Sequence, residues 1–384
     1  MTTKAEQAQV IRGLEGVYVS TTELSRVDGE KGRLFYRGYA IEDLAQQGSF
    51  EETAYLLWYG QLPTTPELET FAQQLAQSRR LPAQLYCVLY DLPRETTPVT
   101  AMRTMVSALA AWEPNADATT SEAELYHARR LTATFTTMTA ALHRIRQGEE
   151  PVLPREDLSH AANFLYMFHG REPSSAAARA MDTFLVLYAD HGFNASTFTA
   201  RVTASTMSDM YSAVTAALGA LKGPLHGGAM EAAMRQFLEI GSPENVDAWF
   251  ERALAEKRRI MGIGHRVYKT WDPRARILRE QARILAAESD EPQWFELAER
   301  LAERTLQHPY FQERRLYPNV DYYGGLVAYY LGFPPEYYTL LFAVSRIVGW
   351  TAHVMEQHAD NRLIRPRALY TGAEDLAYTP IEAR

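Results

Sequence analysis

The chain has 384 residues and a mass of 43.5 kDa, more than one hydrophobic core normally serves, so two lobes are expected. Its 46% hydrophobic and 22% charged residues are typical of a folded protein and exclude a disordered or collagen-like chain. The formal net charge of −8 gives no general attraction for nucleic acid or for an anionic membrane, so an anionic ligand needs local positive charges.

The N-terminal region carries the strand-like sequences of this chain. Residues 16–20 and 32–36 resemble short strands and predict a small hairpin. Residues 1–16 have neither the apolar core of a signal peptide nor the Arg and Ser richness of a transit peptide. The single cysteine, Cys87, lies in the apolar run 85–89, where we expect burial, and it cannot form an internal disulfide. These features predict a cytoplasmic protein.

Helical periodicity dominates the rest of the chain. Thr64 stands three residues before Glu67, and this capping pattern predicts a helix start ahead of residues 68–80. Further amphipathic helices are predicted over residues 121–147, 155–169, 174–190, 242–259 and 335–357, with at least one more within 276–307. The apolar stretch 322–350 is broken by two prolines and contains Arg346, so it predicts buried helices and no membrane span. The predicted fold class is all-α with a minor N-terminal hairpin.

The strongest breaks in the second half are Gly223-Pro224 and Phe333-Pro334-Pro335. They bracket an insert, and from them we predict a small helical domain over residues 224–332. The large helical domain then comprises residues 1–223 and 333–384.

Four loop segments place an ionisable side chain among glycines or turn residues. They are ADHGFN at 189–194, KGPLHGGAM at 222–230, MGIGHRVYK at 261–269 and YPNVDYYGG at 317–325. Glycine allows close approach of the backbone to a ligand, and loops on a helical scaffold often carry function. Any one loop histidine is more often structural, but the four segments together favour a site. The ionisable residues concerned are His191, His226, His265 and Asp321.

Three arginines in the second half form a second group. Arg274 follows His265 by nine residues, Arg346 lies in an apolar helix, and Arg365 lies in the basic segment 362–367. A guanidinium among apolar residues is costly to bury without an anionic partner, so Arg346 indicates an internal acid or a carboxylate or phosphate ligand. The planar fork of arginine suits carboxylates.

Two competing motifs fail. The glycines at 262 and 264 lack the third glycine and the preceding strand of a dinucleotide site. His353 and His358 are separated by about 140° around a helix and cannot share a zinc ion there. We therefore predict no metal.

The loop and arginine motifs, taken with their order and spacing, resemble those of the citrate synthase family. The matching segments are 222–230, 262–275 (GIGHRVYKTWDPRA), 317–325, 343–357 (AVSRIVGWTAHVMEQ) and 361–372 (NRLIRPRALYTG), and the likeness extends to 37–45, 156–167 and 189–200. The resemblance implies an almost entirely helical fold with a large and a small domain that close over the substrates. It also implies a homodimer in which each site borrows a residue from the partner.

The resemblance implies a Si-type citrate synthase, an acyltransferase that condenses acetyl-CoA with oxaloacetate and water at entry to the tricarboxylic acid cycle. His226 would hold and protonate the thioester oxygen, Asp321 would take the methyl proton, and His265 would polarise the oxaloacetate carbonyl. The residues expected at oxaloacetate are His191, Asn194, Arg274, Arg346 and Arg365, the last reaching across the dimer.

Coenzyme A is expected as part of the acyl substrate. The residues expected to contact it are Arg266, Lys269 and Lys222 at the phosphates, with Ile260, Gly262, Ile263, Gly264 and Asn319 around the remainder.

The chain departs from the family pattern close to the chemistry. Met230 stands where the family usually has Asn, and Tyr322 to Gly325 replaces a more usual F-Y-S-G. The replacement of Asn by Met removes a hydrogen-bond donor and an acceptor near His226. Two alternatives therefore stay open: a 2-methylcitrate synthase acting on propionyl-CoA, and a weakly active paralogue that binds coenzyme A or a dicarboxylate.

Overall fold

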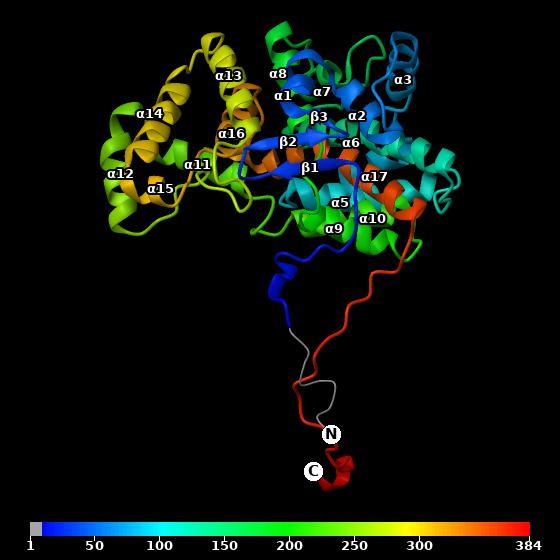
Figure 1. Cartoon of the computed structure of the whole chain (residues 1–384). Coiled ribbons are helices and arrows are strands. Elements are labelled where there is room, and N and C mark those ends of the chain that lie inside the picture. The colour runs from blue at the N-terminus through cyan, green and yellow to red at the C-terminus, as the bar shows by residue number, and fades with distance from the viewer. Residues whose placement is uncertain (1–9) are drawn as a thin grey trace.

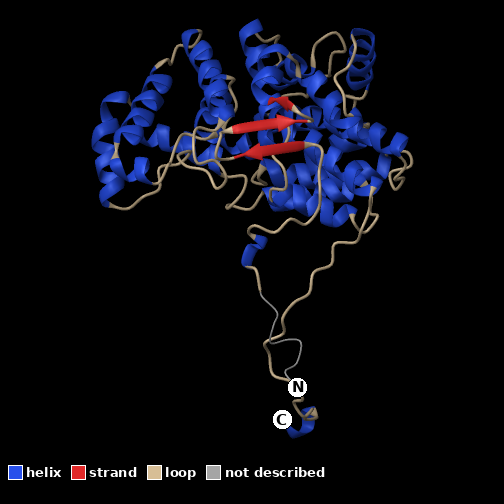
Figure 2. Ribbon diagram, viewed as in Figure 1, coloured by secondary structure: helices blue, strands red, loops and turns tan. Residues whose placement is uncertain are grey.

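The computed structural model describes residues 10–384, which form seventeen α-helices and one small antiparallel sheet (Figures 1 and 2). The predicted all-α class is confirmed. Among the described residues, no helix is both long and apolar enough to cross a membrane.

The sheet comprises β1 (Ser25–Asp28), β2 (Arg33–Tyr36) and β3 (Tyr39–Ala40), in the order β1-β2-β3. The strand predicted at 32–36 is confirmed as β2. The strand predicted at 16–20 is wrong, because residues 17–20 have no regular structure and no strand of the described residues pairs with them. The partner of β2 is instead the more polar β1, which the tight turn at 29–32 brings into register.

The first half of the chain supplies eight helices. They are α1 (Ile41–Gln47), α2 (Phe50–Tyr59), α3 (Thr65–Gln77), α4 (Ala83–Asp91), α5 (Pro98–Leu109), α6 (Ser121–Gln147), α7 (His160–His169) and α8 (Ser175–Tyr188).

Capping residues explain where several of these helices begin. The carboxylate of Glu67 accepts hydrogen bonds from the Thr64 backbone and hydroxyl at 2.7 and 2.6 Å, as the capping pattern predicts. Helix α7 begins later than predicted because Ser159 is its N-cap.

The second half supplies nine helices. They are α9 (Ala195–Ala204), α10 (Met210–Leu221), α11 (Ala229–Ile240), α12 (Val246–Ala255), α13 (Pro273–Ala287), α14 (Gln293–Gln307), α15 (Pro309–Glu313), α16 (Val320–Tyr330) and α17 (Tyr338–Ala359). Helix α17 packs against α6, α8, α9 and α10. Most of its length is buried, and the indole of Trp58 donates to the carbonyl of Val348 at 3.2 Å. This central position carries Arg346 into the interior.

Helices α11 to α16 gather on the left of Figure 1, and α13 packs along α16. Helix α8 contacts both α13 and α17, so it lies where this group meets the remaining helices. The segment after α17 runs away from this body as a tail, whereas the N-terminal segment passes below the body before it turns away at the short 3-10 helix Arg12–Leu14 (Figure 1).

Cys87 is exposed, which corrects the prediction of burial. Helix α4 buries Leu85 and Leu89, which lie on one face. A residue two positions from each is about 200° around the helix, so Cys87 faces away from the core. An apolar run in a helix thus does not bury every member.

Candidate active site

A cleft of about 820 Å³ lies where the helices α11 to α16 meet the remainder of the chain. Its walls come from the N-terminal segment, the turns before α9 and α11, the loop after His265, the first turns of α13 and α16, and α17. The cleft brings together eight of the predicted residues: His191, Asn194, His226, His265, Arg266, Arg274, Asp321 and Arg346.

His226 lies in the turn between α10 and α11 and faces the N-terminus of α9. The backbone N–H of Ser196 donates to Nε2 at 3.3 Å, and the Ser196 hydroxyl lies 2.8 Å from the same atom. Burial, and then the positive charge of Arg346, lowers the pKa of His226 to about 4. The neutral ring therefore carries its proton on Nδ1, which is the donor available to the cleft.

His265 is held by its own loop. The backbone N–H groups of Val267 and Tyr268 donate to its Nδ1 at 3.0 and 3.1 Å. Burial lowers the pKa of His265 to about 4, although Asp272 opposes this shift. With Nδ1 occupied as an acceptor, the neutral ring carries its proton on Nε2.

Asp321 stands in the first turn of α16, where its backbone N–H donates to the N-cap side chain of Asn319 at 2.9 Å. Burial raises the pKa of its carboxyl to about 6, and the positive charge of Arg274 limits the rise. A carboxylate with a raised pKa is a stronger base, yet this one is still ionised at neutral pH.

Arg346 is 1% exposed. Its Nε donates to the carbonyl of Tyr188 at 2.7 Å, and its guanidinium lies 4.4 Å from the centre of the Phe342 ring. Among residues 10–384 it makes no ion pair, so no internal acid neutralises it directly. Burial lowers its pKa to about 10, which leaves it charged at neutral pH. The sequence left two partners open for Arg346, an internal acid and an anionic ligand, and the structure favours the anionic ligand.

Arg274 and His191 both line the cleft, and Tyr268 lies near each of them. Two nitrogens of Arg274, Nε and Nη2, bind the two oxygens of Asp272 at 3.0 and 2.8 Å. His191 Nε2 is 3.2 Å from the hydroxyl of Tyr268. Burial, and then the charge of Arg274, holds the pKa of His191 well below its usual value, so the ring is neutral.

A buried carboxylate supports the turn that carries His191. Asp190 accepts from the N–H of Gly192 at 3.2 Å and from the hydroxyl of Ser25, and it pairs with His353 at 3.2 Å. Burial by itself would raise the pKa of Asp190, but His353 and then Arg346 lower it to about 2. Its negative charge therefore balances part of the charge of Arg346.

The loop at 260–264, predicted for coenzyme A, is fastened to the segment before Asp321. The N–H of Gly264 donates to the carbonyl of Tyr317 at 2.7 Å, and the Asn319 amide donates to the carbonyl of Gly264 at 2.7 Å. Gly262 and Gly264 have φ of +78° and +90°, which favours glycine. Both polar ends of Asn319 are thus used in positioning Asp321 and the loop, and Ile260 is buried.

The remaining predicted residues are spread more widely. Lys222 and Lys269 are exposed and do not line the cleft, whereas Arg266 does. Arg365 lies exposed in the C-terminal tail, outside the cleft of its own chain. The side chain of Met230 is buried with its sulfur 4.0 Å from the Tyr188 hydroxyl.

Several residues that shape the site were not predicted from the sequence. Ser196 orients His226, Asp272 orients Arg274, and Phe342 packs against both Arg346 and His226. Asp272 could have been found, because it stands two residues before Arg274 at a helix N-cap with Pro between them. The contact of Phe342 with His226 depends on distant parts of the chain and has no local signal.

His353 and His358 serve separate carboxylates: His353 pairs with Asp190 and His358 with Glu124. Within the described range, 10–384, no group of three or more His, Cys, Asp or Glu is arranged to hold a metal ion.

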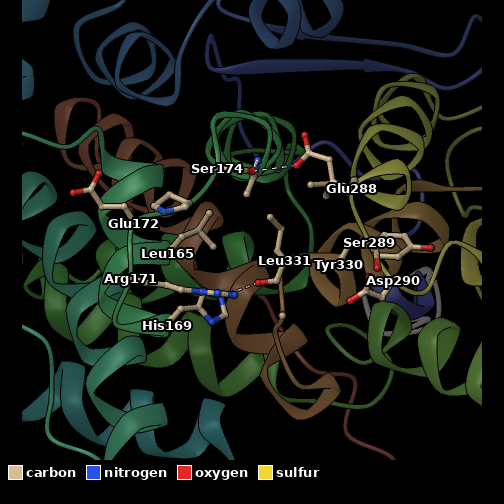
Figure 3. A pocket seen from close by; sticks show the side chains of 14 residues that line it. Leu165, His169, Arg171, Glu172, Ser174, Glu288, Ser289, Asp290, Tyr330 and Leu331 are labelled. Carbon is tan, nitrogen blue, oxygen red and sulfur yellow. Dashed lines mark hydrogen bonds between the residues drawn. The ribbon is translucent and has the colours of Figure 1, made fainter.

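A second cavity of about 590 Å³ lies between the start of α8 and the C-terminal ends of α13 and α16 (Figure 3). Two hydrogen bonds cross it: Ser174 to Glu288 at 3.2 Å and His169 to the Leu331 carbonyl at 2.8 Å. None of the predicted site residues lines it. The cleft at His226 and Asp321 is therefore the candidate active site.

Comparison with known proteins finds relatives that match nearly the whole chain. Residues 13–367 match the family described as citrate synthase, C-terminal domain. Citrate synthase of Haloferax volcanii is 47% identical over 97% of this chain and 98% of its own length. A 2-methylcitrate synthase of Mycobacterium tuberculosis is 42% identical over 96% of this chain and 92% of its own.

One similar solved structure contains bound ligands. It is a ternary complex of carboxymethyl coenzyme A and oxaloacetate with citrate synthase from Thermoplasma acidophilum. Its TM-score to this chain is 0.92 at 40% identity, and the match covers 98% of this chain and all of that one.

Proposed function

This chain belongs to the citrate synthase family, and from that premise we propose that its cleft condenses acetyl-CoA with oxaloacetate and water to give citrate and coenzyme A. The observation that carries the proposal is the convergence of one carboxylate, Asp321, with three neutral imidazoles and two buried arginines. That set matches the chemical demands of the condensation step by step.

The first step is removal of a proton from the thioester methyl group. This carbon acid is very weak, so a carboxylate needs a hydrogen-bond donor at the oxygen where negative charge develops. Asp321 is the base, and its raised pKa strengthens it. The Nδ1–H of His226 is the donor to the thioester oxygen, because Nε2 accepts from the N–H of Ser196 while burial and the charge of Arg346 keep the ring neutral.

The second step is attack of the enol carbon on the oxaloacetate carbonyl. The new carbon–carbon bond converts that carbonyl into an alkoxide, which must be protonated. The Nε2–H of His265 donates this proton, because Nδ1 already accepts hydrogen bonds from two backbone N–H groups. The citryl thioester formed in this way is then hydrolysed by water.

Oxaloacetate is a dianion, and buried positive charge gives it a place to bind. Arg346 makes no ion pair within residues 10–384, and Arg274 is 2% exposed beside His191. Guanidinium groups bind carboxylates with two parallel hydrogen bonds and so fix the orientation of the carbonyl. Asn194 lines the same cleft at the N-cap of α9.

The wider assembly is also part of the proposal. Arg365 is exposed on a tail that leaves its own body, which supports a homodimer in which it completes the partner's cleft. Coenzyme A would contact Arg266, Lys269, Lys222 and the 260–264 loop with Asn319.

The segment 224–332 would close over the substrates as a small domain and exclude water. The lone cysteine agrees with a place in the cytoplasm.

A second candidate substrate is propionyl-CoA, because a 2-methylcitrate synthase is among the close relatives. One added methylene in an apolar pocket discriminates by only about 1–3 kcal/mol. A non-catalytic paralogue is disfavoured, since the base and both histidines are present in the cleft.

Thiol release from the acyl-CoA tests the proposal. Purified protein with oxaloacetate should release coenzyme A from acetyl-CoA, and the ratio of kcat/KM for acetyl-CoA and propionyl-CoA identifies the preferred substrate. Omission of oxaloacetate is the control for plain thioester hydrolysis. No oxaloacetate-dependent release from either thioester would overturn the proposal.

A further inference from the structure

The turn between β1 and β2 packs against the loop that follows His265. Its residues, 29–32, belong to the N-terminal part of the chain, whereas the loop lies in the segment 224–332. The Lys269 N–H donates to the carbonyl of Gly29 at 2.9 Å. Beside it, Arg315 pairs with Glu30 at 3.0 Å, although both side chains are largely exposed. The contact therefore joins two distant parts of the sequence through backbone atoms.

The fit is closest at two glycines. A Cβ atom on Gly29 would lie 2.2 Å from the carbonyl oxygen of Val267, and one on Gly32 would lie 2.7 Å from that of Trp271. Gly32 has a φ of +60°, which favours glycine for a second reason. Gly29 has no such backbone requirement. The approach of Val267 alone excludes a side chain there.

The group against Gly29 also supports His265. The carbonyl of Val267 and the N–H of Tyr268 belong to one peptide unit, which is planar and rigid. That N–H donates to His265 Nδ1 at 3.1 Å. The Tyr268 hydroxyl, in turn, lies 3.2 Å from His191 Nε2. Any displacement of the Val267 oxygen therefore tilts a donor of His265.

We propose that the β1–β2 turn is a positioning element for the reaction: through Gly29 it holds the Val267–Tyr268 peptide where His265 presents Nε2 to the cleft. This inference rests on the proposed function, because it takes His265 as the group that protonates the oxaloacetate oxygen. Gly29 itself does not line the cleft and does not contact substrate.

The Gly29→Ala variant tests this role. A displacement of the order of 1 Å in a catalytic group lowers kcat by about 10- to 100-fold, so we expect a loss in that range. The KM for oxaloacetate should change less than kcat, because Arg274 and Arg346 lie outside the displaced peptide. Deuterium uptake of the 265–271 segment should rise, since the Lys269 N–H loses its acceptor.

Gly219→Ala is the matched control. Gly219 lies in α10 with an ordinary φ, and an added methyl group would meet nothing within 4 Å. Its kcat should stay within about twofold of the unmodified protein, as for most surface substitutions. Folded fraction is measured for each variant by circular dichroism at the assay temperature.

The outcomes separate the possibilities. A kcat for Gly29→Ala equal to that of Gly219→Ala, with unchanged deuterium uptake, would overturn the positioning role. A fall in kcat that only follows the folded fraction would overturn it as well. If the unmodified protein released no thiol, the proposed function would fail, while the exchange measurement would still test the packing of the turn. Gly32→Ala should repeat both effects with an added loss of stability.

Discussion

Helices α13 and α16 pack along each other, and their opposite ends border two different cavities (Figures 1 and 3). Their first turns carry Arg274 and Asp321 into the cleft of about 820 Å³. Their last turns bring Leu285 and Tyr330 to the cavity of about 590 Å³. Both spaces could hold a small molecule, so size does not distinguish the active site.

Burial and helix polarity do distinguish it. The charged residues at the smaller cavity, among them Arg171, Glu172, Glu288 and Asp290, are exposed and solvated. In the cleft, Arg274 and Arg346 are 2% and 1% exposed. The cleft also receives the N-terminal ends of α9, α13 and α16, whose partial positive charge favours anions. Buried charges of this kind bind a dianion strongly and shift the pKa values of neighbouring side chains.

The strongest test of this comparison replaces the base in the cleft. Asp321→Asn keeps the shape of the side chain but cannot accept the methyl proton. Oxaloacetate-dependent thiol release at saturating substrate should fall by about 10³-fold, within the range for loss of a general base. Glu288→Gln at the smaller cavity is the control and should release thiol at the normal rate. Retention of more than a tenth of the activity by Asp321→Asn would contradict its assignment.

A second test asks whether the cleft, unlike the smaller cavity, is completed by a partner chain. Arg365→Ala should raise the oxaloacetate KM by about 10- to 100-fold, the usual loss for a charge-assisted contact. Mixed with Asp321→Asn and allowed to exchange subunits, it should recover activity. Half of the randomly formed dimers are then mixed, and each has one intact site, so recovery approaches about a quarter of normal. No recovery after proven exchange would place Arg365 outside the partner's site.

The pH dependence of kcat/KM is the third test. The base acts only when ionised, and the pKa of Asp321 is raised to about 6. Activity should therefore rise with pH up to about 6 and then level off, so that at pH 5 it is about tenfold below the plateau. His226 and His265 have pKa values of about 4 and stay neutral throughout this window. The residual activity of Asp321→Asn should lack the rise; if the rise persisted, another group would be the base.

The long helices could be predicted from the sequence because their signals are local. The segment 121–147 is a helix with those bounds, because Thr120 caps its start and Gly148 ends it with a φ of +79°. The strand predicted at 16–20 failed for the opposite reason. A strand needs a partner strand, and the sequence of residues 16–20 does not indicate that β2 pairs with the polar residues 25–28 instead.

The site divides in the same way. His226, His265 and Asp321 could be proposed as candidates because each lies in a loop or helix start with a glycine or proline within three residues. What orients them could not be identified. The N–H of Ser196 reaches His226 from another helix, and the β1–β2 turn reaches the His265 loop from the far end of the sequence. These contacts depend on packing between distant elements, which no local pattern encodes.

The smallest effects compare two helix caps, one in each region. Ser174 caps α8 at the smaller cavity by accepting from the N–H of Ala177 at 3.1 Å. Asn194 caps α9 at the cleft by accepting from Thr197 at 3.1 Å, and it also accepts from the hydroxyl of Ser196 at 2.8 Å. Replacement of either by Ala should lower the free energy of unfolding by about 1 kcal/mol, measured by urea denaturation.

Their effects on catalysis should differ. Asn194→Ala removes the acceptor that fixes the Ser196 hydroxyl. Because this hydroxyl lies 2.8 Å from His226 Nε2, the orientation of the His226 ring is then no longer fixed, and kcat should fall by about tenfold. Ser174→Ala breaks only its cap and the hydrogen bond to Glu288, and its kcat should stay within about twofold of normal. Equal losses of kcat in the two variants would mean that stability alone decides activity. A loss confined to Asn194→Ala would show that the cap of α9 also positions the donor of the first step.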